Sequence, residues 1–103
     1  VKSNIAAKHM RIGRFYQEND KYIAALNRFK IVVEDFSVTK FTPEALHRMV
    51  EIYYKLGMKE EAINTAAVIG HNYPESKWYE HSYNLLREKE KELKLLDKVK
   101  NLF

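Results

Sequence analysis

The sequence predicts an all-α protein built from repeated pairs of helices. Only three glycines and two prolines interrupt 103 residues, which leaves long segments suited to helices and too few turns for a β-sandwich or barrel. Hydrophobic residues make up 46% of the chain and charged residues 31%, a balance typical of folded globular chains. An internal repeat then sets the architecture within this class.

The internal repeat relates two segments by a constant offset of 37 residues. The matched positions are Gly13 and Val50, Tyr16 and Tyr53, Ala25 and Ala62, and Ser37 and Pro74. Their spacing is similar to that of the tetratricopeptide repeat, in which small residues let two antiparallel helices approach closely while aromatic side chains fill the space between repeats. Tyr16, Tyr53 and Phe29 are expected to be the aromatic side chains that fill this space.

We therefore expect a right-handed solenoid of two tetratricopeptide-like helix pairs plus a C-terminal capping helix. The first pair is expected over residues 1–37 and the second over residues 38–75. Residues 76–103 are expected to form the capping helix and a charged helical tail.

Local signals place the boundaries of the helices. Asn19 and Asp20 should end the first helix, and Asp20 is expected to cap the second. The third helix should start at Thr42-Pro43-Glu44, with the Thr42 hydroxyl as its cap, and should end at Gly57. The fourth helix is expected from about Lys59 to Asn72.

The last helix should begin after Ser76, whose hydroxyl can cap it. One face of this helix is expected to cover the open edge of the second pair, through Trp78, Tyr79, Ser82, Tyr83 and Leu86. Helical composition continues beyond Arg87, but the chain becomes highly charged.

Composition and motifs exclude most catalytic and cofactor chemistry. Without cysteine the chain has no disulfide, thiolate metal site or cysteine nucleophile, and its four histidines lack metal-ligand spacing. No phosphate loop or nucleophile elbow occurs, so we expect no enzyme, no cofactor and no metal. The net charge of +4 is dispersed, so nucleic acid is not an expected partner, and no run approaches the roughly 20 apolar residues of a membrane span.

A groove between the first helices of successive pairs is the first candidate binding surface. Tyr54 follows the packing residue Tyr53 by one position and should therefore project into this groove. The other residues expected there are Met10, Arg14, Gln17, Glu18, His47, Glu51 and Lys55. Two interpretations stay open: a peptide-binding surface contacted by Arg14, Tyr54, Glu51 and Lys55, or a solvated concave face. His9, at the position of the repeat's tryptophan, is expected to be a partly buried packing residue.

The charged tail is the second candidate surface. Its run of alternating lysine and glutamate from Lys89 to Glu92 is typical of a solvated helix. An apolar stripe that two helix pairs cannot obviously bury follows, made of Leu93, Leu96, Val99, Leu102 and Phe103. Such a stripe indicates a partner contact, a missing neighbour or a self-association surface.

Several longer motifs are sharper than the repeat pattern. They are Ile12-Gly13-Arg14-Phe15-Tyr16, the segment from Tyr22 to Phe29, Glu44-Ala45-Leu46, Tyr53-x-x-Leu56-Gly57 and the segment from Gly70 to Tyr79. Through these motifs, the region from Ile5 to Leu86 resembles the C-terminal half of the BamD family (YfiO or ComL type). This family comprises the tetratricopeptide lipoproteins of the outer-membrane β-barrel assembly machine.

The resemblance implies a non-catalytic periplasmic scaffold at the inner face of the outer membrane, lipid-anchored in its full-length form. It implies docking to a POTRA domain of BamA, with other lipoproteins of the machine as further candidate partners. The position matching the family's docking arginine is Arg28, beside Asn27. This sequence contains neither the lipidated cysteine nor the family's N-terminal repeats, so membrane anchoring is not transferred to it. A cytosolic tetratricopeptide adaptor that binds a peptide, and a basic RNA-binding helical repeat, remain the alternatives.

Overall fold

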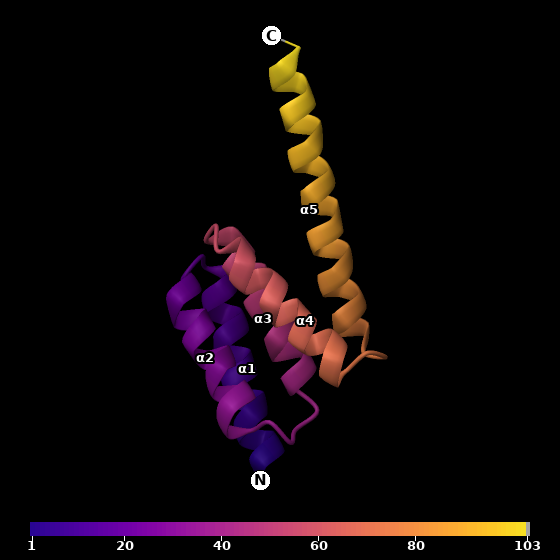
Figure 1. The fold of residues 1–103 in the computed structure, drawn as a ribbon. Coiled ribbons are helices and arrows are strands. Elements are labelled where there is room, and N and C mark those ends of the chain that lie inside the picture. The colour runs from indigo at the N-terminus through magenta and orange to yellow at the C-terminus, as the bar shows by residue number, and fades with distance from the viewer. Residues whose placement is uncertain (103) are drawn as a thin grey trace.

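The computed structural model describes residues 1–102, which form five helices without any strand. The helices are α1 (Lys2–Glu18), α2 (Tyr22–Asp35), α3 (Thr42–Lys55), α4 (Lys59–Asn72) and α5 (Lys77–Asn101). The first four form the body as two packed pairs, and α5 rests on the second pair before it projects away from the body (Figure 1). The predicted all-α repeat architecture is confirmed, whereas the right-handed winding stays a prediction.

Small residues bring the helices of each pair together. Ala25 and Ala62 are completely buried, as the repeat pattern requires. A Cβ atom added to Gly13 would lie 2.7 Å from the ring of Phe29, which is itself completely buried. Phe29 therefore packs on α1 within the first pair, where only the missing side chain of Gly13 leaves room for the ring. Its expected place between the repeats stays a prediction.

The start of α2 differs from the predicted cap. Asp20 adopts a left-handed backbone conformation with φ of 60°, which aspartate tolerates better than most residues, and α2 begins after Lys21 without a side-chain cap. The carboxylate of Asp20 instead accepts a hydrogen bond from the Tyr22 hydroxyl at 2.9 Å. The prediction that Asp20 caps α2 was wrong, because the sharp turn directs this carboxylate to a side chain.

The start of α3 also differs in one respect. Pro43 and Glu44 lie in the first turn as predicted, but Thr42 is already helical and its hydroxyl does not cap α3. It donates to the carbonyl oxygens of Phe36 and Ser37, both at 3.3 Å. The predicted cap was therefore wrong: the buried Thr42 hydroxyl fastens the loop between the two helix pairs.

Three other local predictions are confirmed. Gly57 has a φ of 77° and ends the turn after α3, a conformation that glycine adopts without strain. The bounds of α4 are those predicted, Lys59–Asn72. The hydroxyl of Ser76 accepts a hydrogen bond from the backbone N–H of Trp78 at 3.1 Å and caps α5.

The first half of α5 covers the second helix pair. Ser82 is completely buried, Tyr79 and Leu86 pack partly buried against the core, and Tyr83 departs from the prediction because it remains 55% exposed. The remainder of α5 leaves the body, and its stripe residues Leu93, Leu96, Val99 and Leu102 are all exposed. Phe103, predicted as part of the stripe, lies outside the described residues. None of the helices over residues 1–102 is both long and apolar enough to cross a membrane.

Candidate functional site

The inner groove, defined here by facing residues of α1, α3 and α5, is the first candidate site. Its floor is an ionic network between α1 and α3. Arg14 pairs with Glu44 at 3.1 Å, and Arg48 contacts Glu44 at 3.3 Å and Glu51 at 3.1 Å. The amide of Gln17 donates to the Glu51 carboxylate at 3.1 Å. One ion pair and one hydrogen bond thus join α1 to α3, and the groups of the network remain partly accessible.

Glu51 is the most strongly perturbed acid of this network. Burial by itself would raise the pKa of Glu51, but the interactions with His47 and Gln17 and the nearby charge of Arg48 outweigh burial and lower the pKa to about 2. The carboxylate therefore stays ionised down to strongly acidic pH. It provides a fixed negative charge in the groove.

Most of the predicted groove residues come together. Gln17, Glu18, Glu51, Tyr54 and Lys55 line one cavity of about 630 Å³. The same cavity is also lined by Asp20, Tyr22, Leu85 and Lys89. Three acids and two lysines thus surround an aromatic wall, an arrangement that can hold a polar peptide segment through both signs of charge. Arg14 lies outside this cavity, where it pairs with Glu44.

Two predicted groove residues were placed on the wrong side. Met10 is completely buried and belongs to the hydrophobic core, so it does not face the groove. His47 is also buried, and its Nδ1 lies 2.7 Å from the Ser82 hydroxyl of α5 while its Nε2 lies 3.6 Å from Glu51. His47 therefore links α3 to α5 instead of facing a ligand.

The sequence interpretation missed Glu44 and Arg48 as groove residues. Their spacing of four residues on one helix was the signal that could have identified the pair. Arg48 also lies over the ring of Trp78, with 5.3 Å between the guanidinium carbon and the ring centroid. Lys77 approaches the same ring at 5.0 Å, so the rim of the groove ends in an aromatic residue flanked by two cations.

Arg28 and Asn27 form a separate candidate site on α2. Asn27 is exposed, and Arg28 is partly buried with its Nη1 at 3.1 Å from Nδ1 of His9 on α1. Burial, followed by the positive charge of Arg28, lowers the pKa of His9, so the ring tends to be neutral and can accept from the guanidinium. His9 also stacks near Phe36 with 5.9 Å between ring centroids, which confirms its packing role.

Neither site is built like a metal centre. Within residues 1–102, no three histidine, aspartate or glutamate side chains lie close enough to share a metal ion. The chemistry that both sites offer is recognition of charged groups.

Comparisons with known proteins give one consistent result. The model of the YfiO family, described as an outer membrane lipoprotein, matches residues 1–68. The chain is 46% identical over 88 residues to the outer membrane protein assembly factor BamD of Caulobacter vibrioides, covering 85% of this chain and 29% of that protein. It is 44% identical over 87 residues to the BamD of Rickettsia prowazekii, covering 84% of this chain and 35% of that protein. The chain thus spans about a third of the length of these curated relatives.

Proposed function

This chain belongs to the YfiO family of outer membrane lipoproteins, and on that premise we propose that it is part of a non-catalytic scaffold for outer-membrane protein assembly. The relatives of Caulobacter vibrioides and Rickettsia prowazekii, both named outer membrane protein assembly factor BamD, support this scaffold role. The helical repeats support it as well, because stacked helix pairs expose broad surfaces for protein partners. The proposed location is the periplasm, at the inner face of the outer membrane.

The proposed partner is a POTRA domain of a BamA-like protein, docked on the surface of Arg28 and Asn27. The observation that carries this proposal is the contact between Arg28 and His9, because it orients a partly exposed guanidinium before any partner arrives. A preoriented arginine loses little conformational entropy on binding a carboxylate and can form a bidentate pair with it.

The variant Arg28→Glu tests this docking. Truncating an arginine whose partner carboxylate is desolvated costs about 2–5 kcal/mol of binding free energy, and a salt-screened rim pair costs less. We expect calorimetric titration of Arg28→Glu with the POTRA domain to show a larger loss than truncation, because the reversed charge also repels the carboxylate. Lys30→Glu is the matched control, because it reverses a partly buried cation on the same helix two residues away. Equal affinity of Arg28→Glu and the unmodified chain would remove Arg28 from the interface. A large loss of melting temperature would show that Arg28 is instead structural.

A second candidate function is binding of an extended peptide in the inner groove. It is favoured by the cavity of about 630 Å³, where Tyr54 lies among groups of both charges. Screening immobilised peptides of varied charge with Tyr54→Ala tests it, and Tyr73→Ala, which changes a partly buried tyrosine outside the cavity, is the control. Loss of a peptide signal only in Tyr54→Ala would support this function, and peptide binding unchanged by Tyr54→Ala would oppose it.

A further inference from the structure

Arg28 differs from two arginines of the inner groove in the kind of acceptor that holds its guanidinium. Arg14 and Arg48 pair with carboxylates, a group that is ionised at neutral pH. The guanidinium of Arg28 instead lies 3.1 Å from Nδ1 of the His9 ring, and it forms no ion pair with a carboxylate of residues 1–102. The position of Arg28 therefore depends on an acceptor that can take up a proton.

The chemistry of the two groups determines which form of His9 the contact requires. A guanidinium has only N–H donors, so Nδ1 of His9 must be the acceptor, and the proton of the neutral ring must lie on Nε2. A protonated imidazole carries N–H groups on both nitrogens and has no acceptor, whichever way the ring turns. Two cations would then face each other with donors only. The contact between Arg28 and His9 exists only while the ring is neutral.

Most charged groups around His9 favour the neutral ring. Lys8 is its neighbour on α1, and Arg28 and Asp35 act on it from α2. Burial is the largest cause that lowers the pKa of His9 below the ordinary 6.5, Arg28 and Lys8 lower it further, and Asp35 raises it. Phe36, which does not titrate, lies near the ring with 5.9 Å between centroids. The ring is therefore neutral at pH 7 and takes up its proton as the pH falls below 6.5.

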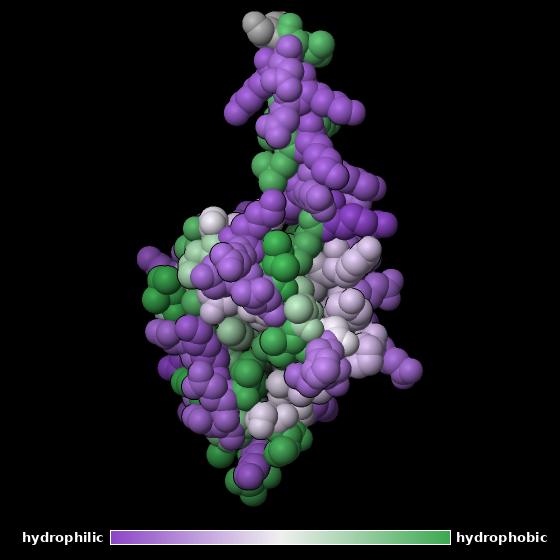
Figure 2. Space-filling view, in the orientation of Figure 1, coloured by the Kyte–Doolittle hydropathy of each residue, from purple (hydrophilic) through white to green (hydrophobic). Residues whose placement is uncertain are grey.

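The contact with His9 leaves the other edge of the Arg28 guanidinium for a partner. It uses Nη1, whereas Nε and Nη2 form an edge that can pair with a carboxylate through two parallel hydrogen bonds. Asn27 is exposed beside Arg28, and Ile23, one helical turn before Asn27, is 62% exposed. Figure 2 shows hydrophilic and hydrophobic side chains interleaved over α2, at the left of the body. A protein partner would meet an oriented guanidinium within a surface of mixed character.

We propose that His9 makes docking at Arg28 sensitive to pH: the neutral ring holds the guanidinium in its docking orientation, and the protonated ring releases it. This inference rests on the docking function proposed above for Arg28. A released side chain must be ordered again when a carboxylate binds, which weakens binding by about twofold to tenfold. The charge that His9 gains has a smaller effect, because it lies on the Nη1 side of the guanidinium in partly solvated surroundings. Docking therefore weakens as the pH falls.

Nitrogen chemical shifts of the His9 ring test the contact without any partner. Between about pH 8 and about pH 5, we expect the neutral ring to carry its proton on Nε2 and to titrate below pH 6.5. Arg28→Gln should move this titration to higher pH, because it removes a neighbouring positive charge. Arg11→Gln, which changes an exposed arginine of α1, is the matched control and should leave the titration unchanged. Identical titrations in Arg28→Gln and the unmodified chain, equal shifts in both variants, or a neutral ring protonated on Nδ1 would overturn the proposal.

Calorimetric titration with the POTRA domain at about pH 8 and about pH 5 tests the effect on docking. The variant His9→Gln keeps an acceptor for Arg28 at either pH, because its amide oxygen does not titrate. From the higher to the lower pH, we expect the Kd of the unmodified chain to rise about twofold to tenfold more than that of His9→Gln. His71→Gln removes an exposed histidine of α4 and should behave like the unmodified chain. Groups of the POTRA domain that titrate affect every variant alike.

The outcomes separate the pH control from the docking function itself. Equal pH dependence in His9→Gln and the unmodified chain, or a Kd that rises less in the unmodified chain than in His9→Gln, would overturn the pH control while docking at Arg28 stands. Unchanged affinity of Arg28→Glu at neutral pH would instead refute the docking function, and the ring shifts of His9 would still decide whether protonation breaks the contact.

Discussion

The contact between Gly13 and Phe29 gives the most demanding prediction about the fold. In Gly13→Ala the new Cβ would lie 2.7 and 2.9 Å from two carbons of the Phe29 ring, closer than carbon atoms pack. Phe29 is completely buried and cannot rotate into solvent, so overpacking should cost about 1–3 kcal/mol. The alanine also favours the helix by about 1 kcal/mol over glycine, which offsets part of this cost. We expect a net destabilisation of about 1 kcal/mol.

A loss of this size should lower the melting temperature by about 4–8 °C in a domain of this length. Gly70→Ala is the matched control, because its Cβ would lie 2.6 Å from the ring of Tyr79, which is only partly buried and can shift. It should cost less than Gly13→Ala. In a double-mutant cycle, Phe29→Leu should remove most of the penalty of Gly13→Ala. A Gly13→Ala protein as stable as the unmodified chain would refute the packing argument.

Three further predictions concern the core, the ionic network and the tail. Ala25→Leu and Ala62→Leu add volume at completely buried positions and should each lower the free energy of unfolding by about 1–3 kcal/mol; unchanged thermal midpoints would contradict the repeat register. Because the pKa of Glu51 is about 2 in the folded chain and its ordinary value is 4.5, its contribution to stability is present above pH 4.5 and is lost as the pH falls from 4.5 to 2. In urea unfolding, the free energy of unfolding of Glu51→Gln should fall less steeply between pH 4.5 and 2 than that of the unmodified chain. An identical fall in both proteins would show that Glu51 does not cause this loss of stability. Truncation after Leu86 should leave the melting temperature of dilute protein nearly unchanged, because most of the removed residues are exposed; a drop of several degrees would show that the tail folds onto the body.

The sequence predicted several of the residues that line the inner groove, but it did not predict how those residues are buried and paired. Helical spacing predicted that Glu51 and Tyr54 share one face of α3, because residues three and four apart lie on the same side of a helix. Together with Gln17 of α1, both line the same cavity. The same reasoning misplaced Met10, which is buried in the core. It also misplaced His47, because α3 packs against α2, α4 and α5 and therefore buries more than one face. Which residues form that second buried face depends on the helix that packs there.

The sequence by itself determined the features that depend on local chemistry. The repeat spacing, the left-handed Gly57, the cap at Ser76 and the bounds of α4 follow from interactions within a few residues. Its longer motifs also sufficed to indicate the family, which the comparisons confirmed.

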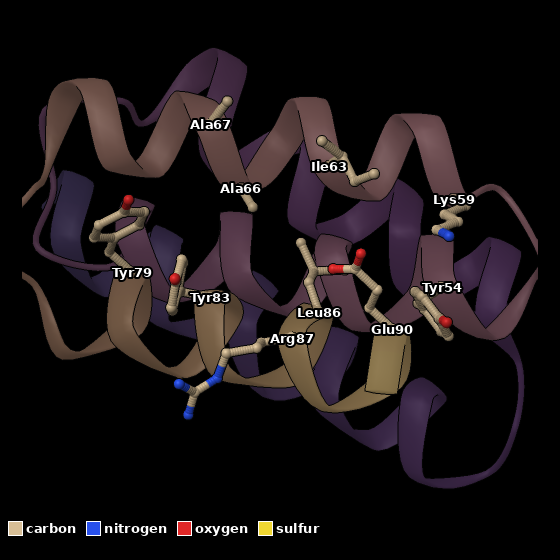
Figure 3. Close-up of a pocket in the computed structure, with 10 residues that line it drawn as sticks. All are labelled: Tyr54, Lys59, Ile63, Ala66, Ala67, Tyr79, Tyr83, Leu86, Arg87 and Glu90. Atoms are coloured by element: carbon tan, nitrogen blue, oxygen red, sulfur yellow. The ribbon is translucent and has the colours of Figure 1, made fainter. Parts of the chain in front are cut away.

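Tertiary structure decided where polar side chains find partners across the chain. His47 contacts Ser82, 35 residues away. Asp20 and Thr42 form local contacts instead of their predicted caps, because a tight turn and an interhelical loop set their backbone conformation. The cavity between α4 and α5 (Figure 3) is likewise a product of packing, since residues of α3, α4 and α5 line it. His47 and Ser82, and the residues of this cavity, meet only after the helices pack, so no local pattern could assign them.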